Sequence, residues 1–214
     1  MRQVDYSVYV VTDRSLSRGR STPDVVREAV EGGATCVQLR EKQAGTREFL
    51  EEARALCPWL RGRNIPLFIN DRVDIALAVE ADGVHLGQQD MPIADARRLG
   101  PPSWIIGVSA ESVEDAVRAE REGADYIGVS PVFATPTKTD TARPLGLEGL
   151  RAMRAAVRIP LVAIGGIHLR NAREVIRAGA DGLAVVSAIV SADSPREAAA
   201  ALRREIDFEK GVQR

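Results

Sequence analysis

The sequence predicts a single-domain α/β protein that forms a closed (β/α)8 TIM barrel, and three observations support this. Apolar, strand-like runs alternate with amphipathic, helix-like runs eight times along the 214 residues. The apolar runs are nearly continuous in Val, Ile and Leu, which is typical of parallel strands covered by helices. The segments between them repeat with a two-unit period, which favours a closed barrel over an open doubly wound sheet. We therefore expect one domain over residues 1–214.

The strand-like runs are short and have glycine, proline or polar residues at their ends. They are YVVTD (9–13), CVQLRE (36–41), PLFIND (66–71), GVHLG (83–87), WIIGVSA (104–110), YIGVSPVF (126–133), PLVAIGG (160–166) and GLAVVSA (182–188). The even-numbered runs follow GGAT, ADG, GADY and GADG, whereas the third, fifth and seventh follow a proline in NIP, GPPS and RIP. Glycine and small residues at these points let a helix end and turn tightly into the next strand.

Helical periodicity fills the intervals between the strands. Ser112 is the expected N-cap of the helix in 112–123, and Ser194-Pro195-Arg196-Glu197 reads as a capping box that opens the last helix. The expected buried faces are Val113, Ala116 and Val117 in 112–123, and Leu169, Ala172, Val175 and Ile176 in 169–179.

Composition excludes several classes of function. The formal net charge is −1 and the charges are interspersed, so we expect no nucleic-acid or membrane partner. The apolar runs are too short to span a bilayer, and RQVDYSVYVV near the start lacks the apolar core of a signal peptide. Cys36 and Cys57 do not form a CxxC or metal spacing. We expect a cytoplasmic protein with two reduced, structural thiols.

Polar residues gather at the carboxyl ends of the expected strands, where barrel enzymes carry their active sites. These strand ends hold Thr12, Asp13, Gln38, Arg40, Lys42, Asn70, Asp71, His85, Gln88, Asp90, Ser109, Thr135, Thr137, Lys138, Gly165, Gly166, Val186 and Ser187. The amino-terminal strand ends carry glycine, alanine and proline instead. This asymmetry predicts the site at the carboxyl-terminal end.

Two loops fit a phosphate site. IGGI (164–167) and VVSAI (185–189) follow the seventh and eighth strands, the usual phosphate-binding position in these barrels. Gly165 and Gly166 would let backbone amides approach an oxyanion closely. The alternative is that the paired glycines only form a tight turn.

Two aspartates on neighbouring strands suit Mg²⁺. Asp71 ends the third strand and Asp90 follows the fourth, so their oxygens are expected to lie close together. The alternative for Asp71 is the N-cap of a following helix. For His85 we favour a hydrogen-bonded residue beside the core over a zinc ligand, because the other histidine, His168, lies three strands away.

The run QLREK (38–42) places Gln38, Arg40 and Lys42 on one face of a strand and Leu39 and Glu41 on the other. An amide and two cations facing one way predict an anion clamp, although a solvated strand end is the alternative. Because two carboxylates neutralise Mg²⁺, a polyphosphate would need further positive charge from Arg40, Lys42 and Lys138. We expect Asp13, Arg14 and Glu41 to form ion pairs.

Taken in order, these motifs resemble the thiamine phosphate synthase family from about residue 8 to about residue 190. They are QLREK, FINDRVDIAL, DGVHLGQQD, GVSA, YIGVSPVFATPTK, VAIGGI and DGLAVVSAI. The resemblance implies a transferase that joins 4-amino-2-methyl-5-(diphosphooxymethyl)pyrimidine to thiazole phosphate and releases diphosphate, with Mg²⁺ as cofactor. The implied partners are these two small molecules alone, and neither motif nor pattern predicts an oligomeric state.

The resemblance also implies the site residues. Asp71 and Asp90 would carry the metal. Gln38, Arg40, Lys42, Asn70, Ser109 and Lys138 would bind the pyrimidine diphosphate, and Thr135, Thr137, Gly166, Val186 and Ser187 the thiazole phosphate. Leu39, Glu41 and Pro136 belong to the same binding segments, and the catalytic set would be Arg40, Lys42, Ser109 and Lys138.

A dissociative mechanism follows from the charges. Cations would stabilise the departing diphosphate while a pyrimidinylmethyl cation forms, and the thiazole nitrogen, which carries no proton, would attack without a general base. The long polar loop ATPTKTDTARPLG (134–146) is expected to close over the site and exclude water. The alternatives are a thiazole tautomerase-like relative and a non-catalytic barrel that binds thiamine precursors, and the complete metal and diphosphate set argues against both.

Overall fold

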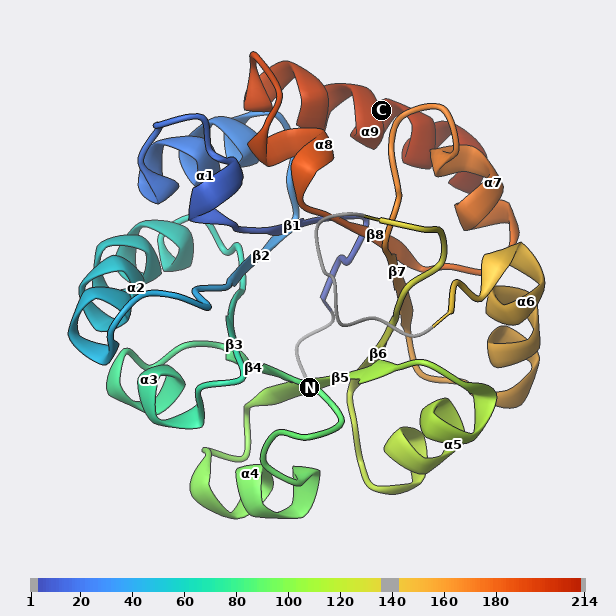
Figure 1. Ribbon diagram of the computed structural model, residues 1–214, viewed down its shortest axis with the longest axis horizontal. Coiled ribbons are helices and arrows are strands. Elements are labelled where there is room, and N and C mark those ends of the chain that lie inside the picture. Colours follow the sequence, from blue (N-terminus) through green and yellow to red (C-terminus); the bar gives the residue numbers. More distant parts are fainter. Residues whose placement is uncertain (1–3, 136–142, 213–214) are drawn as a thin grey trace.

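The computed structural model describes residues 4–135 and 143–212. Within them, eight parallel strands close into one barrel in sequence order, because β8 pairs with β1. Helices surround the barrel on its outside (Figure 1). The predicted (β/α)8 architecture is therefore confirmed.

The strands are short and the helices vary from one turn to more than four. The strands are β1 (Val8–Val11), β2 (Cys36–Leu39), β3 (Leu67–Asn70), β4 (Gly83–Leu86), β5 (Ile105–Ala110), β6 (Tyr126–Val129), β7 (Leu161–Ile164) and β8 (Gly182–Val185). The helices are η1 (Arg14–Leu16), α1 (Thr22–Glu31), α2 (Thr46–Arg61), α3 (Val73–Ala78), α4 (Ile93–Leu99), α5 (Val113–Arg121), α6 (Gly146–Ala156), α7 (Ala172–Arg177), α8 (Ser187–Val190) and α9 (Pro195–Lys210).

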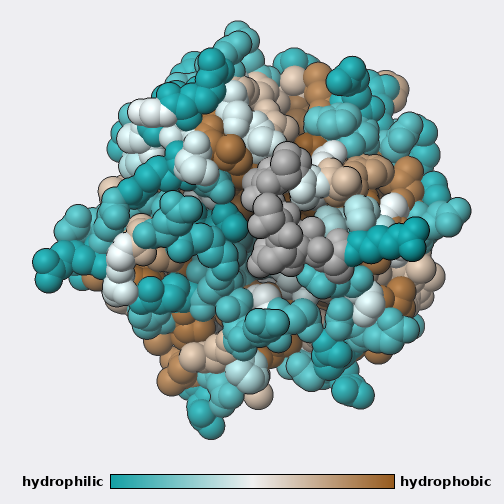
Figure 2. All heavy atoms as spheres, in the orientation of Figure 1, coloured by the Kyte–Doolittle hydropathy of each residue, from teal (hydrophilic) through white to brown (hydrophobic). Residues whose placement is uncertain are grey.

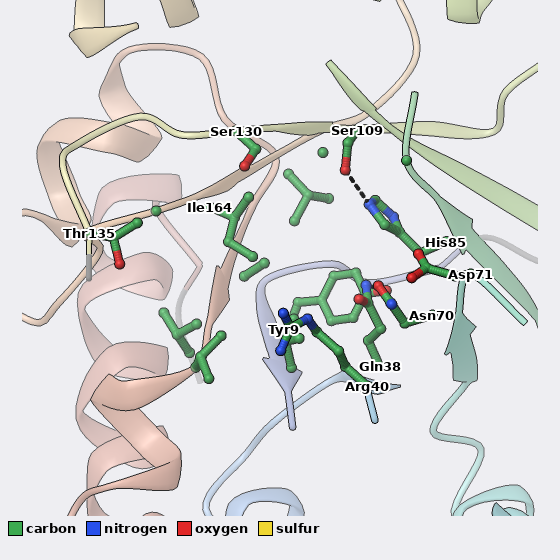
Figure 3. Close-up of a pocket in the computed structure, with 18 of the residues that line it drawn as sticks. Tyr9, Gln38, Arg40, Asn70, Asp71, His85, Ser109, Ser130, Thr135 and Ile164 are labelled. Atoms are coloured by element: carbon green, nitrogen blue, oxygen red, sulfur yellow. Dashed lines mark hydrogen bonds between the residues drawn. The ribbon is translucent and has the colours of Figure 1, made fainter. Parts of the chain in front are cut away.

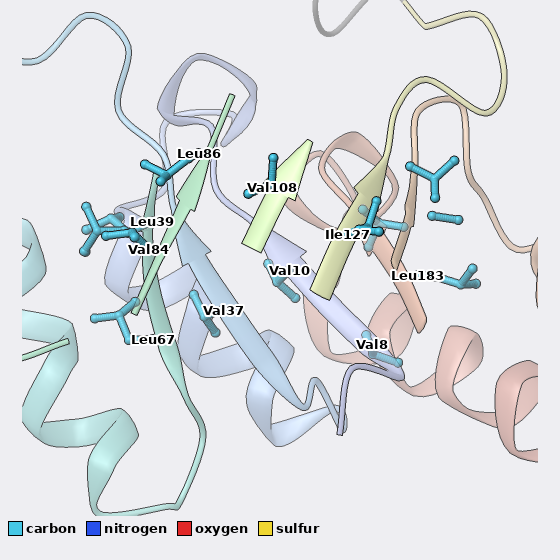
Figure 4. Packing of buried hydrophobic residues seen from close by; sticks show 14 of the residues in the cluster. Val8, Val10, Val37, Leu39, Leu67, Val84, Leu86, Val108, Ile127 and Leu183 are labelled. Atoms are coloured by element: carbon cyan, nitrogen blue, oxygen red, sulfur yellow. The ribbon is translucent and has the colours of Figure 1, made fainter. Parts of the chain in front are cut away.

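Alternate strand residues face opposite sides of the barrel wall. Val8, Val10, Val37 and Leu39 point outward into the apolar layer between strands and helices, where their side chains are fully buried (Figure 4). Burying each such side chain contributes about 1.5–3 kcal/mol. The inward positions hold a separate cluster that contains four aromatic rings, those of Tyr6, Tyr9, Phe68 and Tyr126. On the face that Figure 2 shows, hydrophilic residues make up most of the rim and apolar ones lie in small groups.

The amino-terminal end of the barrel is tied by a clamp that repeats at every second strand. The residue just before each even-numbered strand makes two hydrogen bonds with one residue of the preceding odd-numbered strand. It donates its backbone N–H to that residue's carbonyl oxygen, and its side-chain oxygen accepts that residue's N–H. The pairs are Thr35 with Val8, Asp82 with Leu67, Asp125 with Ile106 and Asp181 with Leu161, at 2.7–3.0 Å. These clamps give the GGAT, ADG, GADY and GADG repeat a physical reason that the sequence pattern left open.

Helix starts agree with the predictions better than element lengths do. Ser112 and Ser194 cap α5 and α9 by accepting the N–H of Asp115 and Glu197. The predicted strand 126–133 was too long: β6 ends at Val129, and the chain then runs beside the end of β7, where the N–H of Val132 bonds Ile164 O. The remaining strands are also shorter than predicted.

Two residues expected in buried helix faces are exposed instead. Val117 is 42 % exposed because α5 buries Ala116 and Ala119 and turns the next position outward. Leu169 is 47 % exposed because it precedes α7, whereas Ala172, Val175 and Ile176 are buried as predicted. Cys36 and Cys57 are buried free thiols. No helix in the described ranges combines the length and the apolar character needed to cross a bilayer.

Candidate active site

A cavity of about 520 Å³ opens at the carboxyl-terminal end of the barrel, and every strand contributes to its wall (Figure 3). The predicted residues that line it are Gln38, Arg40, Lys42, Asn70, Asp71, Asp90, Ser109, Thr135, Gly166, Val186 and Ser187. Side chains from strands distant in sequence thus meet at one mouth, as the asymmetry of polar residues predicted.

Five predicted site residues and part of the predicted lid contribute no described side chain to the cavity wall. Leu39 is fully buried in the outer apolar layer, so it could serve a ligand through its backbone alone. Glu41 turns away from the cavity toward Arg14 and Glu52 on the helix side. Pro136, Thr137 and Lys138, with the 136–142 part of the predicted lid, lie outside the described residues.

Two carboxyl groups form the acidic centre of the site. The Asp71 carboxylate accepts a hydrogen bond from Lys42 Nζ at 2.5 Å and lies against the carboxyl of Asp90. Burial raises the pKa of Asp71, but its bonds with Lys42 and Asp90 outweigh burial and leave it below its ordinary value. Burial and the bonded Asp71 raise the pKa of Asp90. The two carboxyls therefore lie together, with the pKa of one lowered and that of the other raised, and their oxygens are placed as ligands for a cation.

Local backbone geometry holds both aspartates in place. Asp71 has φ 61°, in the left-handed region, and its N–H bonds His85 O at the end of β4. The N-cap alternative for Asp71 is wrong, because the N-cap of α3 is Arg72 and no side chain caps that helix. Asp90 turns back over β4 and accepts the N–H of Gly87 through Oδ2 at 2.6 Å. A Cβ at residue 87 would lie 2.9 Å from that oxygen, so glycine permits the turn.

Arg40 and Lys42 lie on the β2 side of the same mouth. β2 ends at Leu39, so the strict strand alternation predicted for QLREK stops there, yet Gln38, Arg40 and Lys42 all reach the cavity. Arg40 Nη1 donates to Asp13 Oδ2 at 3.1 Å, and its N–H bonds Thr12 Oγ1. Asp13 and Arg14 therefore form the ion pairs expected of them, and the segment that follows β1 orients the Arg40 guanidinium.

The opposite wall is built from the loops after β6, β7 and β8. Thr135 lies across the cavity from Asp71 and His85 (Figure 3). Gly165 and Gly166 have φ of 99° and 64°, and a Cβ on either would come within 2.7 Å of Pro131, Phe133 or Ala134. Both glycines are thus required to bring the β6 and β7 loops into contact. Val186 and Ser187, at the start of α8, complete this wall.

Comparison with known proteins agrees with this geometry. The family model described as "Thiamine monophosphate synthase" matches residues 8–189. The chain belongs to the thiamine monophosphate synthase family. It is 60 % identical to the thiamine-phosphate synthase of Albidiferax ferrireducens over 94 % of this chain and 91 % of that protein. It is 58 % identical to the one of Chloroflexus aurantiacus over 94 % of this chain and 92 % of that protein.

Solved structures separate the family from the fold. The thiamine phosphate pyrophosphorylase from Pyrococcus furiosus superposes with a TM-score of 0.89 at 47 % identity, covering 96 % of this chain and 97 % of that one. A 3-hexulose-6-phosphate synthase superposes with a TM-score of 0.70 at 20 % identity, covering 93 % and 99 %. That second likeness shows the fold alone, because unrelated activities share this barrel.

The floor of the cavity in this family member contains residues that the sequence pattern did not identify as site residues. Tyr9 and Tyr126 are buried inward-facing side chains whose hydroxyls lie 2.7 Å apart. Tyr126 also reaches His85 Nδ1, and His85 Nε2 lies 2.9 Å from Ser109 Oγ. His85 is thus a hydrogen-bonded residue, as favoured over the zinc reading. Side chains alternate between the two faces of a strand, so counting from Gln38 and Ser109 could have identified both tyrosines as inward-facing. The same count could not have shown that the two side chains meet.

Proposed function

We propose that this chain catalyses the condensation of 4-amino-2-methyl-5-(diphosphooxymethyl)pyrimidine with thiazole phosphate to thiamine phosphate and diphosphate. One observation carries the proposal beyond family membership: a single cavity has an acidic pair with cations on one wall and the glycine loops on the opposite wall. Two phosphorylated substrates bound on these walls would point their reacting ends at each other. The cavity volume of about 520 Å³ is in the range of small-molecule sites.

Mg²⁺ is the cofactor that the acidic pair fits best. Asp71 and Asp90 supply adjacent hard oxygen ligands, and a cation between them would relieve the interaction with Asp71 that raises the pKa of Asp90. The groups of three or more His, Cys, Asp or Glu that a zinc site requires are not found in the described residues. When bound, Mg²⁺ would stabilise the negative charge that collects on the leaving diphosphate.

The chain's own residues would then act on charge and position. Arg40 and Lys42, and Lys138 by family resemblance, stabilise the diphosphate as the C–O bond breaks and the oxygen keeps the electron pair. Asn70 and Ser109 hold the pyrimidine beside them. Thr135, Gly166 and Ser187, with Pro136, Thr137 and Val186 in the same loops, anchor the thiazole phosphate. The thiazole nitrogen then forms the new C–N bond, and holding it in line is worth roughly 7–11 kcal/mol of barrier.

Incubation of the purified protein with both substrates and Mg²⁺ tests the proposal. We expect diphosphate release that requires thiazole phosphate, together with formation of thiamine phosphate. Proton exchange on the thiazole without diphosphate release would indicate the tautomerase alternative, and binding without turnover the non-catalytic one. We also propose a cytoplasmic location, in keeping with the buried free thiols Cys36 and Cys57.

A further inference from the structure

A continuous hydrogen-bond chain crosses the floor of the cavity and joins residues from five strands. We call it the floor chain: Gln38, Tyr9, Tyr126, His85 and Ser109, in that order. The four links are Gln38 Nε2 to Tyr9 OH at 3.1 Å, Tyr9 OH to Tyr126 OH at 2.7 Å, Tyr126 OH to His85 Nδ1 at 2.9 Å, and His85 Nε2 to Ser109 Oγ at 2.9 Å. Both ends of the chain, Gln38 and Ser109, line the cavity.

Counting protons gives the chain a direction. The amide nitrogen of Gln38 can only donate, so Tyr9 accepts from it and directs its own single proton to Tyr126. Tyr126 in turn directs its proton to His85 Nδ1. Because Nδ1 accepts, the imidazole carries its proton on Nε2 and donates to Ser109 Oγ. The Ser109 hydroxyl oxygen therefore accepts a hydrogen bond within the floor chain, and the hydroxyl proton is left to donate to a ligand.

The barrel interior is shaped to hold this chain. A Cβ at Gly107 would lie 2.0 Å from Cζ of Tyr126, and one at Gly128 would lie 2.8 Å from Cε1 of His85. Tyr9 is 1 % exposed and Tyr126 is fully buried, so neither phenol can exchange its partner for bulk water. Burial also raises the pKa of both phenols well above the usual range, so each hydroxyl keeps its proton and can donate one hydrogen bond.

We propose that the floor chain makes Ser109 a hydrogen-bond donor and Gln38, through its carbonyl oxygen, an acceptor toward the substrate. This pair selects a heteroaromatic ring that carries both an acceptor nitrogen and an amino group. Tyr9 and Tyr126 are positioning residues, because they act through His85 on Ser109. The inference rests on the proposed function, since the aminopyrimidine is the ring that presents both groups.

Kinetics with ring analogues test the selection. In the full-length enzyme, replacing the accepting ring nitrogen of the pyrimidine diphosphate by CH should lower kcat/KM by about tenfold or more, the effect of one lost hydrogen bond to a polar site. In Tyr126→Phe the same replacement should cost about twofold or less, because Ser109 no longer has a fixed direction. Tyr6→Phe is the matched control: its ring packs against Tyr126 with centroids 4.8 Å apart, and its hydroxyl is not a link of the floor chain. In Tyr6→Phe, replacing the ring nitrogen should lower kcat/KM as much as it does in the wild type.

A second variant and a spectroscopic measurement keep the test independent of folding and of turnover. Tyr9→Phe breaks the chain one link further away and should also reduce discrimination. The sequence has two histidines, so ¹H–¹⁵N spectra of the imidazoles are assigned with His168→Gln. We expect His85 as the Nε2–H tautomer in the wild type and a mixture of tautomers in Tyr126→Phe.

Three outcomes would overturn the inference. These are an Nδ1–H tautomer in the wild type, which means that the chain runs in reverse, equal discrimination in Tyr126→Phe and Tyr6→Phe, and a wild type indifferent to both ring nitrogens. A wild type without turnover would refute the proposed function instead, and the tautomer measurement would still decide the direction of the chain.

Discussion

At the amino-terminal end of the barrel, Asp82, Asp125 and Asp181 each accept the N–H of a strand residue, whereas at the carboxyl-terminal end Asp71 and Asp90 lie against each other. The first three have backbone partners 2.7–2.9 Å away. The last two have shifted pKa values, lowered for Asp71 and raised for Asp90, and Asp71 has a left-handed backbone conformation. An aspartate near a strand end therefore bonds to the backbone at one end of the barrel and lies against another carboxyl at the other end.

The difference shows how the barrel separates stability from chemistry. Carboxylates bonded to strand amides lower the free energy of the fold, because each satisfies a backbone donor at the edge of the sheet. At the mouth, burial and the neighbouring Asp71 disfavour the ionised form of Asp90, whereas the bond from Lys42 favours the Asp71 carboxylate. Substitutions at the two ends should consequently separate activity from the free energy of unfolding.

The largest expected effect is at the acidic pair. Asp71→Asn with Asp90→Asn should lower kcat/KM by about 10³-fold or more, because several kcal/mol of charge stabilisation is lost. The midpoint of thermal unfolding should stay the same or rise, since two neighbouring carboxyls become neutral. Steady-state kinetics with saturating Mg²⁺ and calorimetry measure both. Asp82→Asn is the matched control at the other end, and a similar loss of kcat/KM there would contradict the comparison.

A smaller loss of activity is expected from the lysine in the loop after β6. Lys138→Ala should lower kcat by about 10²-fold while leaving the unfolding midpoint unchanged, because it removes a charge used in the transition state. Lys210→Ala is the control, since Lys210 Nζ donates to Asp181 O and Ser7 Oγ at the amino-terminal end. Near-normal turnover in Lys138→Ala would refute the role that family resemblance gives to this residue.

At the amino-terminal end the effect should appear in stability. Asp125→Ala leaves the N–H of Ile106 without its acceptor and removes the ion pair with Arg97, so we expect the free energy of unfolding to fall by about 1–3 kcal/mol. Urea unfolding measures this loss, and kcat should stay within about twofold of wild type. Asp95→Ala removes an exposed ion pair with Arg98 and should change stability by less than about 0.5 kcal/mol. Equal effects of the two variants would mean that the clamp contributes nothing.

The smallest expected effect concerns Glu41, beneath the loop that carries Arg40 and Lys42. Burial, and then the neighbouring Glu52, raise the pKa of Glu41 to about 7 from an ordinary 4.5. The folded state therefore binds this proton more tightly than the unfolded state, and the stabilisation, complete below the unfolded pKa, is lost as pH rises through the folded pKa.

Glu41→Gln imitates the protonated carboxyl and tests this shift. From pH 5 to pH 8, the free energy of unfolding of the wild type should fall relative to the variant by on the order of 1–2 kcal/mol. Chemical denaturation at both pH values measures the difference. Glu48→Gln is the control, because Glu48 also contacts Arg14 but its side chain is 53 % exposed. Parallel pH profiles of wild type and Glu41→Gln would contradict the raised pKa.

The sequence by itself determined the barrel and most of its mouth. Apolar runs of strand length that alternate with amphipathic helices leave few other folds, and residues at the carboxyl ends of parallel strands must converge on one edge. The adjacency of Asp71 and Asp90 follows from strand order, and the inward direction of Gln38 follows from a period of two that ends with β2 at Leu39. Both are local properties that can be read along one strand or between neighbours.

Only the tertiary structure decided which inward side chains meet. Tyr9 and Tyr126 are separated by 117 positions, and their contact depends on how the closed barrel brings β1 and β6 to the same level. The space that Gly107 and Gly128 leave for Tyr126 and His85 is set by neighbouring strands. Val117 was misplaced because helical spacing gives the width of an apolar face but not which residues at its edge are covered: α5 buries Ala116 and Ala119 instead. Barrel closure joins distant segments through packing, and no periodicity within a segment encodes that packing.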